Sequence, residues 1–121
     1  MIKIDLPLPN SKLLPNRSFG RSYHATKELR IKAHTEGYKA ARAYFGMFSE
    51  DSRVKITVRV FKKTTAYYDL DNLLASMKKH IDGVFSGLGI DDKQIDDFRV
   101  TRGGVDKLNP RIELFISEIK E

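Results

Sequence analysis

Residues 53–85 read RVKITVRVFKKTTAYYDLDNLLASMKKHIDGVF, and this stretch decides the fold. From 54 to 60 every second residue is valine or isoleucine, and the residues between them are lysine, threonine and arginine. Side chains in a strand alternate between two faces. The pattern therefore predicts a strand over residues 53–63 that has one face in the core and one basic face.

The second half of the same stretch has the spacing of a helix. From Leu70 to about Phe85 the apolar side chains fall on one stripe, which predicts an amphipathic helix. Gly87 and Gly89 are expected to end it. The stripe consists of Leu73, Leu74, Met77, Ile81, Val84 and Phe85.

The rest of the chain supplies four more elements. Strands are expected at residues 2–6, at about 95–102 and at about 110–118, and a helix from about 26 to 48. Residues 10–23 are expected to form a long polar loop between the first strand and that helix. The order β-α-β-α-β-β predicts an α+β fold, a single compact domain over the whole chain, with helices packed on one mixed sheet. The order of the strands stays open.

Composition excludes several kinds of site. The 121 residues contain no cysteine, which rules out disulfides, thiolate nucleophiles and cysteine-ligated zinc. Three scattered histidines offer no metal-binding spacing. No apolar run of about eighteen residues and no signal-peptide core is seen, so we expect a cytoplasmic protein without membrane contact. Only metals that prefer oxygen ligands fit this composition.

Charge is divided unevenly along the chain, whose net charge is +6. Residues 1–63 hold 14 Lys and Arg against 5 Asp and Glu, whereas residues 64–121 hold 8 against 11. A basic half favours nucleic-acid binding, and a solvated basic surface is the simpler alternative. The candidate DNA contacts lie on the long loop and at the start of the first helix. They are Lys12, Asn16, Arg17, Arg21, Lys27, Arg30 and Lys32.

Carboxylates gather around the second predicted helix. At about 100° per residue, Lys78 and Asp82 each lie within roughly 20° of Asp71 on its surface. If Asp69 to Asp71 is extended, both carboxylates face the same way and can reach one cation. Mg²⁺ commonly binds one or two carboxylates together with substrate phosphates. The pattern indicates metal-dependent chemistry on a polyanion.

Each of these residues also has a structural explanation. Asp71 can be the N-cap of the helix. Lys78 and Asp82, four residues apart, can form an ordinary surface ion pair. Asp91 and Asp92 can be turn residues, and they reach the other carboxylates only if the chain returns there. The joint occurrence of these residues in a basic protein favours the metal site.

The pattern Asp69-Leu-Asp71-Asn72, then Lys78, Asp82 and Asp91-Asp92-Lys-Gln-Ile, resembles the signature of RusA-type Holliday junction resolvases. These enzymes of DNA recombination and repair are often encoded by phages and prophages. The resemblance covers nearly the whole chain. It departs from the best-known motif in one spacing: the interval from Asn72 to Lys78 is three residues longer than in that motif, and Ala75 stands where the shorter motif has its lysine.

The resemblance implies a homodimeric, Mg²⁺-dependent endodeoxyribonuclease that nicks four-way DNA junctions symmetrically. It implies no organic cofactor, and Mn²⁺ is a possible substitute for Mg²⁺. Asp69, Asp71 and Asp92 match the catalytic carboxylates that hold the metal, with Asp91 as a further or alternative ligand. Lys78 matches the catalytic lysine, while Asn72 and Asp82 are expected to support the site.

Two other functions remain open on the same residues. A less specific nuclease that acts on flaps or other branched DNA would use the same carboxylates and differ in substrate shape. A DNA-binding module without catalysis would explain the basic half of the chain. It would not explain why carboxylates gather beside a surface that binds phosphates.

Overall fold

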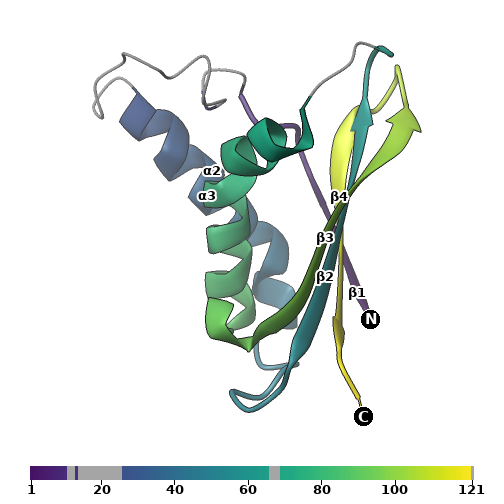
Figure 1. Ribbon diagram of the computed structural model, residues 1–121. Helices are drawn as coiled ribbons and strands as arrows, with labels where there is room; N and C mark the ends of the chain where they lie inside the picture. The colour runs from purple at the N-terminus through teal and green to yellow at the C-terminus, as the bar shows by residue number, and fades with distance from the viewer. Residues whose placement is uncertain (11–12, 14–25, 66–68, 121) are drawn as a thin grey trace.

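The computed structural model describes residues 1–10, 13, 26–65 and 69–120. Its helices and strands follow the β-α-β-α-β-β order that the sequence predicts (Figure 1). In chain order the elements are β1 (Ile2–Leu6), α2 (Lys27–Ala41), the 3₁₀ turn η3 (Arg42–Tyr44), β2 (Val54–Lys62), α3 (Leu70–Leu88), the 3₁₀ turn η4 (Asp92–Gln94), β3 (Ile95–Val105) and β4 (Arg111–Glu118).

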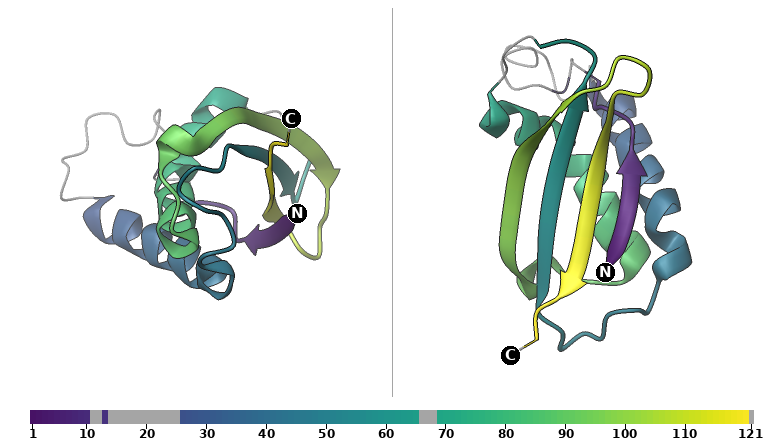
Figure 2. Two further views of the ribbon diagram at one scale, coloured as in Figure 1. Left: turned by 90° about the horizontal axis from the view of Figure 1, so that it is seen from below. Right: turned by 90° about the vertical axis from the view of Figure 1, so that its right-hand side faces the viewer.

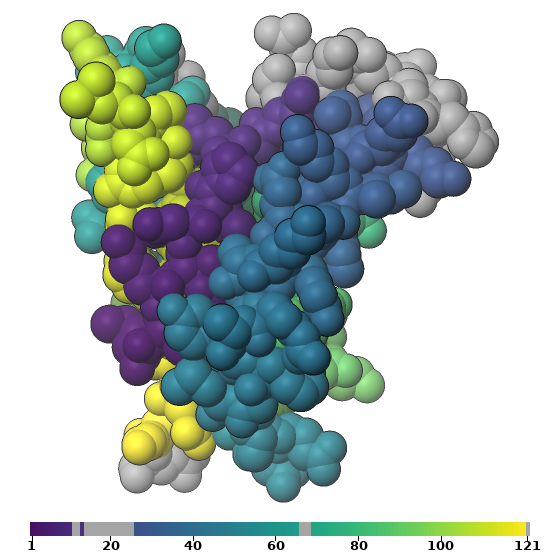
Figure 3. Space-filling model, turned by 180° about the vertical axis from the view of Figure 1, so that it is seen from behind, coloured from purple at the N-terminus to yellow at the C-terminus, as the bar shows by residue number. Residues whose placement is uncertain are grey.

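The four strands form one mixed sheet in the order β1-β4-β2-β3. β2 is parallel to β3 and antiparallel to β4, which in turn is antiparallel to β1. Both helices lie on one face of the sheet, and the opposite face is open (Figure 2). The predicted α+β fold with helices on one mixed sheet is confirmed. α2 lies beside β1 at one edge (Figure 3), and β3 forms the other edge.

The core lies where both predicted periodicities meet. The alternate residues of β2, from Val54 to Val60, are at most 1% exposed, so the strand prediction is confirmed. Five of the six stripe residues of α3 are buried, and Leu74 is half-buried. Burying one such aliphatic or aromatic side chain contributes about 1.5–3 kcal/mol. This packing fixes which face of α3 points away from the sheet.

α2 and α3 pack through two glycines. A Cβ atom on Gly37 would lie 2.1 Å from the backbone oxygen of His80, and one on Gly83 would lie 2.1 Å from that of His34. The two backbones therefore touch where the helices meet. Gly37 is a weak point for helix propensity alone, but the tertiary structure uses it for this close approach.

Two element boundaries differ from the prediction. The first helix ends at Ala41 rather than near residue 48, and Gly46, with a φ of 84°, then adopts a left-handed conformation that favours glycine. Gly103 lies inside β3 rather than in the turn after it. A Cβ atom there would lie 2.6 Å from the ring of Phe61 on the neighbouring strand, so glycine lets that ring lie over the backbone.

No helix within the described ranges is both long enough and apolar enough to cross a membrane.

Candidate functional site

The N-terminus of α3 holds two of the predicted carboxylates. Asp69 is the N-cap: its backbone is extended, and its Oδ1 accepts a hydrogen bond from the Asp71 backbone N–H at 2.9 Å. Asp71 lies in the first helical turn and is exposed. The interpretation of Asp71 as the cap is therefore wrong, because Asp69 has that role. The Asp71 carboxylate lies where the helix N-terminus favours negative charge.

A groove of about 440 Å³ runs along α3 beside the edge strand β3, and we call it the acidic groove. Asp71 and Lys78 both line it, as the helical spacing predicts. Ala75 lines it as well, one turn before Lys78. A lysine at either position would thus face the same groove, so the longer motif spacing keeps the amine on this side of the helix. The remaining lining residues are Leu74, Ile81 and Phe98.

Asp82 does not join Asp71 and Lys78 in the lining of the acidic groove. Its carboxylate lies 3.9 Å from the Lys79 ammonium instead. The proposed surface pair between Lys78 and Asp82 is wrong for this reason. Asn72 is half-buried within the first turns of α3. Within the described part of the chain, Lys78 has no carboxylate in ion-pair contact, so its charge is available to a ligand.

Asp91 belongs to a compact turn after α3. Its Oδ1 accepts the Lys93 backbone N–H at 2.9 Å, and its own N–H donates to Gln94 Oε1 at 3.0 Å, which forms a capping box. Gln94 is buried and donates to the backbone oxygens of Ser49 and Ser52 at 2.9 and 3.0 Å. The turn interpretation of Asp91 is therefore correct, and Gln94 anchors the turn to the loop before β2.

Asp91 and Asp92 influence each other's ionisation. The hydrogen bond from the Lys93 backbone, followed by one with Asp92, lowers the pKa of Asp91. The pKa of Asp92 is raised, because it shares a hydrogen bond with Asp91 and feels the negative charge of that neighbour. Two adjacent carboxylates with separated pKa values repel each other once both are ionised, and a bound cation relieves that repulsion.

The two carboxylate pairs lie at opposite ends of α3 (Figure 1). The helix has 19 residues, which at 1.5 Å per residue is about 28 Å. Among the residues that the structure describes, no three His, Asp or Glu side chains come together to hold a metal. One chain therefore does not bring Asp91 or Asp92 to Asp69 and Asp71, because a continuous helix separates them.

The predicted DNA contacts fall into three groups. Lys12, Asn16, Arg17 and Arg21 lie outside the described residues. Lys27 and Arg30 line a groove between α2 and α3. Lys32 lies on another side of α2, where its ammonium is 4.0 Å from Glu36. Glu36 also lies 3.1 Å from Nε2 of the buried His80. Lys32 itself is exposed and does not line the groove of Lys27 and Arg30.

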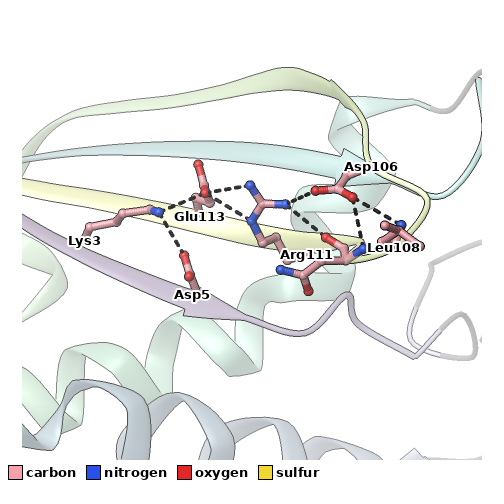
Figure 4. Close-up of polar contacts among 7 residues, drawn as sticks. Lys3, Asp5, Asp106, Leu108, Arg111 and Glu113 are labelled. Atoms are coloured by element: carbon pink, nitrogen blue, oxygen red, sulfur yellow. Dashed lines mark hydrogen bonds and ion pairs between the residues drawn. The ribbon is translucent and has the colours of Figure 1, made fainter.

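Charges on the open face of the sheet are used in a different way. Glu113 on β4 is 6% exposed and accepts Lys3 at 3.0 Å and Arg111 at 3.0–3.1 Å (Figure 4). Arg111 also donates to Asp106 at 2.8 Å, which ties the β3–β4 turn to the sheet. Burial favours a higher pKa for Glu113, but hydrogen bonds from Lys3 and Arg111 outweigh it and leave the pKa below its ordinary value. We call these four charges, together with Asp5 beside Lys3, the sheet network.

Comparisons with known proteins leave the family open. No protein-family model matches the chain. It is similar to an uncharacterized protein of Xylella fastidiosa, 30% identical over 99 residues that make up 78% of this chain. The match spans only 62% of that relative's length. The structure is also similar to the periplasmic domain of Helicobacter pylori MotB, with a TM-score of 0.42 at 17% identity, over 96% of this chain and 81% of that one. A TM-score of this size does not establish a shared fold.

Proposed function

We propose that this protein is a Mg²⁺-dependent, structure-specific endodeoxyribonuclease of the RusA type, which resolves four-way DNA junctions by paired nicks in the cytoplasm. The observation that carries the proposal is the acidic groove. It places the exposed carboxylate of Asp71 and the amine of Lys78 on one side of α3, next to the capping carboxylate of Asp69. The strongly basic composition of the chain supports a polyanionic substrate.

The donor set at the start of α3 fits a hard divalent cation. Asp69 uses Oδ1 as the cap, which orients its carboxylate, and Asp71 is not needed for capping. These two residues would hold the ion with oxygen ligands, as Mg²⁺ requires. When bound, Mg²⁺ supplies a Lewis acid for the phosphate and a water of lowered pKa.

Lys78 has a separate role in the proposed reaction. Its ammonium lines the same groove as Asp71, so it can face a phosphate that enters there. A positive charge at this point stabilises the negative charge that develops on the phosphoryl oxygens during in-line attack. Cleavage by an activated water leaves a 5′-phosphate and a 3′-hydroxyl. Lys78 should therefore affect turnover more than affinity.

A second copy of the chain can complete the carboxylate set. If two α3 helices lie antiparallel about a two-fold axis, the start of each helix meets the end of the other. Asp69 and Asp71 of one protomer then lie near the Asp91–Asp92 turn of its partner. Two-fold dimers are also the simplest assembly for two matched cuts.

The first test is cleavage of a labelled four-way junction with and without Mg²⁺, with linear duplex of the same sequence as substrate control. Wild type should give paired nicks near the crossover only with metal. Asp71→Asn should lose at least about 100-fold in rate while it binds the junction as well or better, because a negative charge is removed. Asp51→Asn, an exposed carboxylate in the loop before β2, is the matched control and should cut normally.

The outcomes separate the candidate functions. Full Mg²⁺-dependent cleavage by Asp71→Asn would overturn the metal site. Tight binding without any nicking by wild type would favour a DNA-binding module. Equal cutting of junction and duplex would favour the less specific nuclease.

A mixing experiment tests the dimer. Asp71→Asn and Asp92→Asn, each inactive alone, are refolded together. If the site is shared between protomers, each mixed dimer has one intact site and one doubly altered site, so single nicks should return. Asp69→Asn mixed with Asp71→Asn should restore nothing, because both changes lie at the same end of α3. No recovery in the first mixture would show that the site is not shared in this way.

A further inference from the structure

A second groove, of about 220 Å³, lies between α2 and α3, and we call it the basic groove. Four of its five lining residues carry nitrogen donors, and none is acidic. The lining residues are Lys27, Arg30, Ile31, His34 and Lys79. Of these five lining residues, the sequence predicts DNA contacts for Lys27 and Arg30. The groove adds His34 and Lys79, which come together with them only in the folded chain.

Helix geometry explains why these residues meet. The other three α2 residues lie three, four and seven positions after Lys27, so all four share one side of the helix. Lys79, on α3, lies beside them because the backbones of α2 and α3 come close together at Gly37 and Gly83, which we call the glycine contact. Gly83, one turn after Lys79, touches the backbone oxygen of His34. The close approach of the two backbones therefore holds Lys79 beside His34, and the groove is as rigid as the contact between the helices.

The positive charge of the basic groove is poorly compensated. Lys79 is 3.9 Å from Asp82, at the limit of an ion pair, and both side chains are more than a third exposed. Such exposed pairs contribute little and are readily exchanged for another anion. Arg30 donates to the hydroxyl of Thr26, which orients the guanidinium. Within the described part of the chain, Lys27 and His34 are in ion-pair contact with no carboxylate.

We propose that the basic groove binds the phosphate backbone of the branched DNA on which the protein acts, an inference that rests on the proposed function. Lys78 and Lys79 are neighbours on α3, about 100° apart around the helix. One faces the acidic groove and the other the basic groove, so α3 forms the ridge between them. A DNA strand held in the basic groove crosses this ridge to reach Asp71.

The size of the ridge suits a few nucleotides. Asp71 and Lys79 are eight residues apart, or about 12 Å along the helix axis. One strand of duplex DNA carries one phosphate per about 3.4 Å of axis, so this span corresponds to about three or four phosphates. Ile31, which is 55% exposed, offers an apolar contact for deoxyribose between the cations. The basic groove would thus set the distance from the bound phosphates to the cut.

The open face of the sheet is the obvious competing surface, and its charges argue against it. Lys3 and Arg111 are held by the buried Glu113, and Arg99 lies 3.1 Å from Asp97. Phosphate binding there would have to break these pairs or place DNA beside carboxylates. The helical side offers cations without that cost, so the DNA should lie against the helices.

The test is junction binding in EDTA, where no cleavage occurs, over a series of salt concentrations. The variant Lys27→Ala/Lys79→Ala removes two charges from the basic groove. Its affinity should fall at least about 10-fold, and the slope of log K against log salt should drop by nearly 2, since each phosphate contact contributes about 0.9. Lys55→Ala/Arg59→Ala removes two charges from β2 on the open face and should change affinity less than about 2-fold.

Cleavage rates at saturating protein complete the test. Because neither Lys27 nor Lys79 lines the acidic groove, the groove variant should lose Mg²⁺-dependent cleavage in proportion to its loss of binding and recover cleavage as the protein concentration approaches saturation. A different result is that the groove variant binds with the same affinity and salt slope as wild type, while wild type cleaves the junction. That result would overturn the proposed role of the basic groove and leave the proposed function intact. Equal losses in both double variants would also overturn it, because the effect would be one of net charge. Failure of wild type to bind the junction would end both proposals.

Discussion

The two sides of this molecule use charged residues for different purposes. On the open face of the sheet, Lys3 and Arg111 converge on Glu113, and Arg111 continues to Asp106. On the helical side, Lys27 and Lys78 have no such partner among the described residues, and Lys79 has only a long one. The cations of the sheet network thus meet a carboxylate, whereas Lys27 and Lys78 meet none among the described residues.

That difference separates charges that stabilise the fold from charges that are available to bind a ligand. A buried carboxylate such as Glu113 must be paired, since burying an unpaired charge is costly. Its cations are therefore committed to the protein. Cations that lack a carboxylate keep their full attraction for phosphate. The number of basic residues alone does not identify a binding surface, whereas their pairing does.

The largest effect on the helical side is expected from Gly83→Ala. The added methyl group would lie 2.1 Å from the His34 backbone oxygen, so the helices must move apart. We expect a loss of about 3 kcal/mol in the free energy of unfolding, although alanine is the better helix former by about 1 kcal/mol. Chemical denaturation measures this loss. Ser86→Ala, on the exposed side of α3, is the control and should be neutral.

Gly83→Ala also tests whether the basic groove depends on the glycine contact. The junction affinity of Gly83→Ala is measured at a temperature where the variant is still folded. It should fall as it does in the Lys27→Ala/Lys79→Ala variant, because Lys79 no longer lies beside His34. Unchanged stability and affinity would show that the helices can separate without consequence. The glycine contact would then not be what holds the basic groove in the shape that binds DNA.

A smaller effect is expected from Glu113→Gln on the sheet side. The substitution keeps the shape of the side chain but removes the charge that Lys3 and Arg111 share. We expect a loss of about 2 kcal/mol in the free energy of unfolding at neutral pH, with junction binding unchanged. Asp97→Asn, which alters an exposed pair on the same face, should have little effect.

The sheet network also predicts how stability depends on pH. The pKa of Glu113 is below its ordinary value of 4.5 in the folded protein, so the folded state favours the ionised form. Its contribution is complete above 4.5 and is lost as the pH falls through the lowered folded pKa. The difference in stability between wild type and Glu113→Gln should therefore shrink in acid. A constant difference across this range would mean that packing, rather than charge, explains the substitution.

The sequence correctly predicted the helices and strands and the side of α3 that carries Asp71 and Lys78. It did not predict which carboxylates lie close together. The stripe and polar line of α3 follow from a local repeat, so Asp71 and Lys78 were correctly placed on one side. The capping role was assigned to Asp71 and belongs to Asp69, because boundaries depend on backbone geometry at single residues. Asp91 and Asp92 could not be positioned from spacing, since their distance from Asp69 depends on the length and continuity of the helix between them.

By itself, the sequence determined the order of strands and helices, the buried face of β2 and α3, and the placing of Asp71 and Lys78 on one side of α3. These depend on periodicities of two and 3.6 residues, which are local properties of the chain. Only the tertiary structure decided the strand order, the glycine contact between α2 and α3, and the partners of each charge. It also placed Lys79 with Lys27 and Arg30, and it placed the two carboxylate pairs at opposite ends of the 19-residue helix α3. Those facts depend on contacts between distant segments, and no local pattern records them.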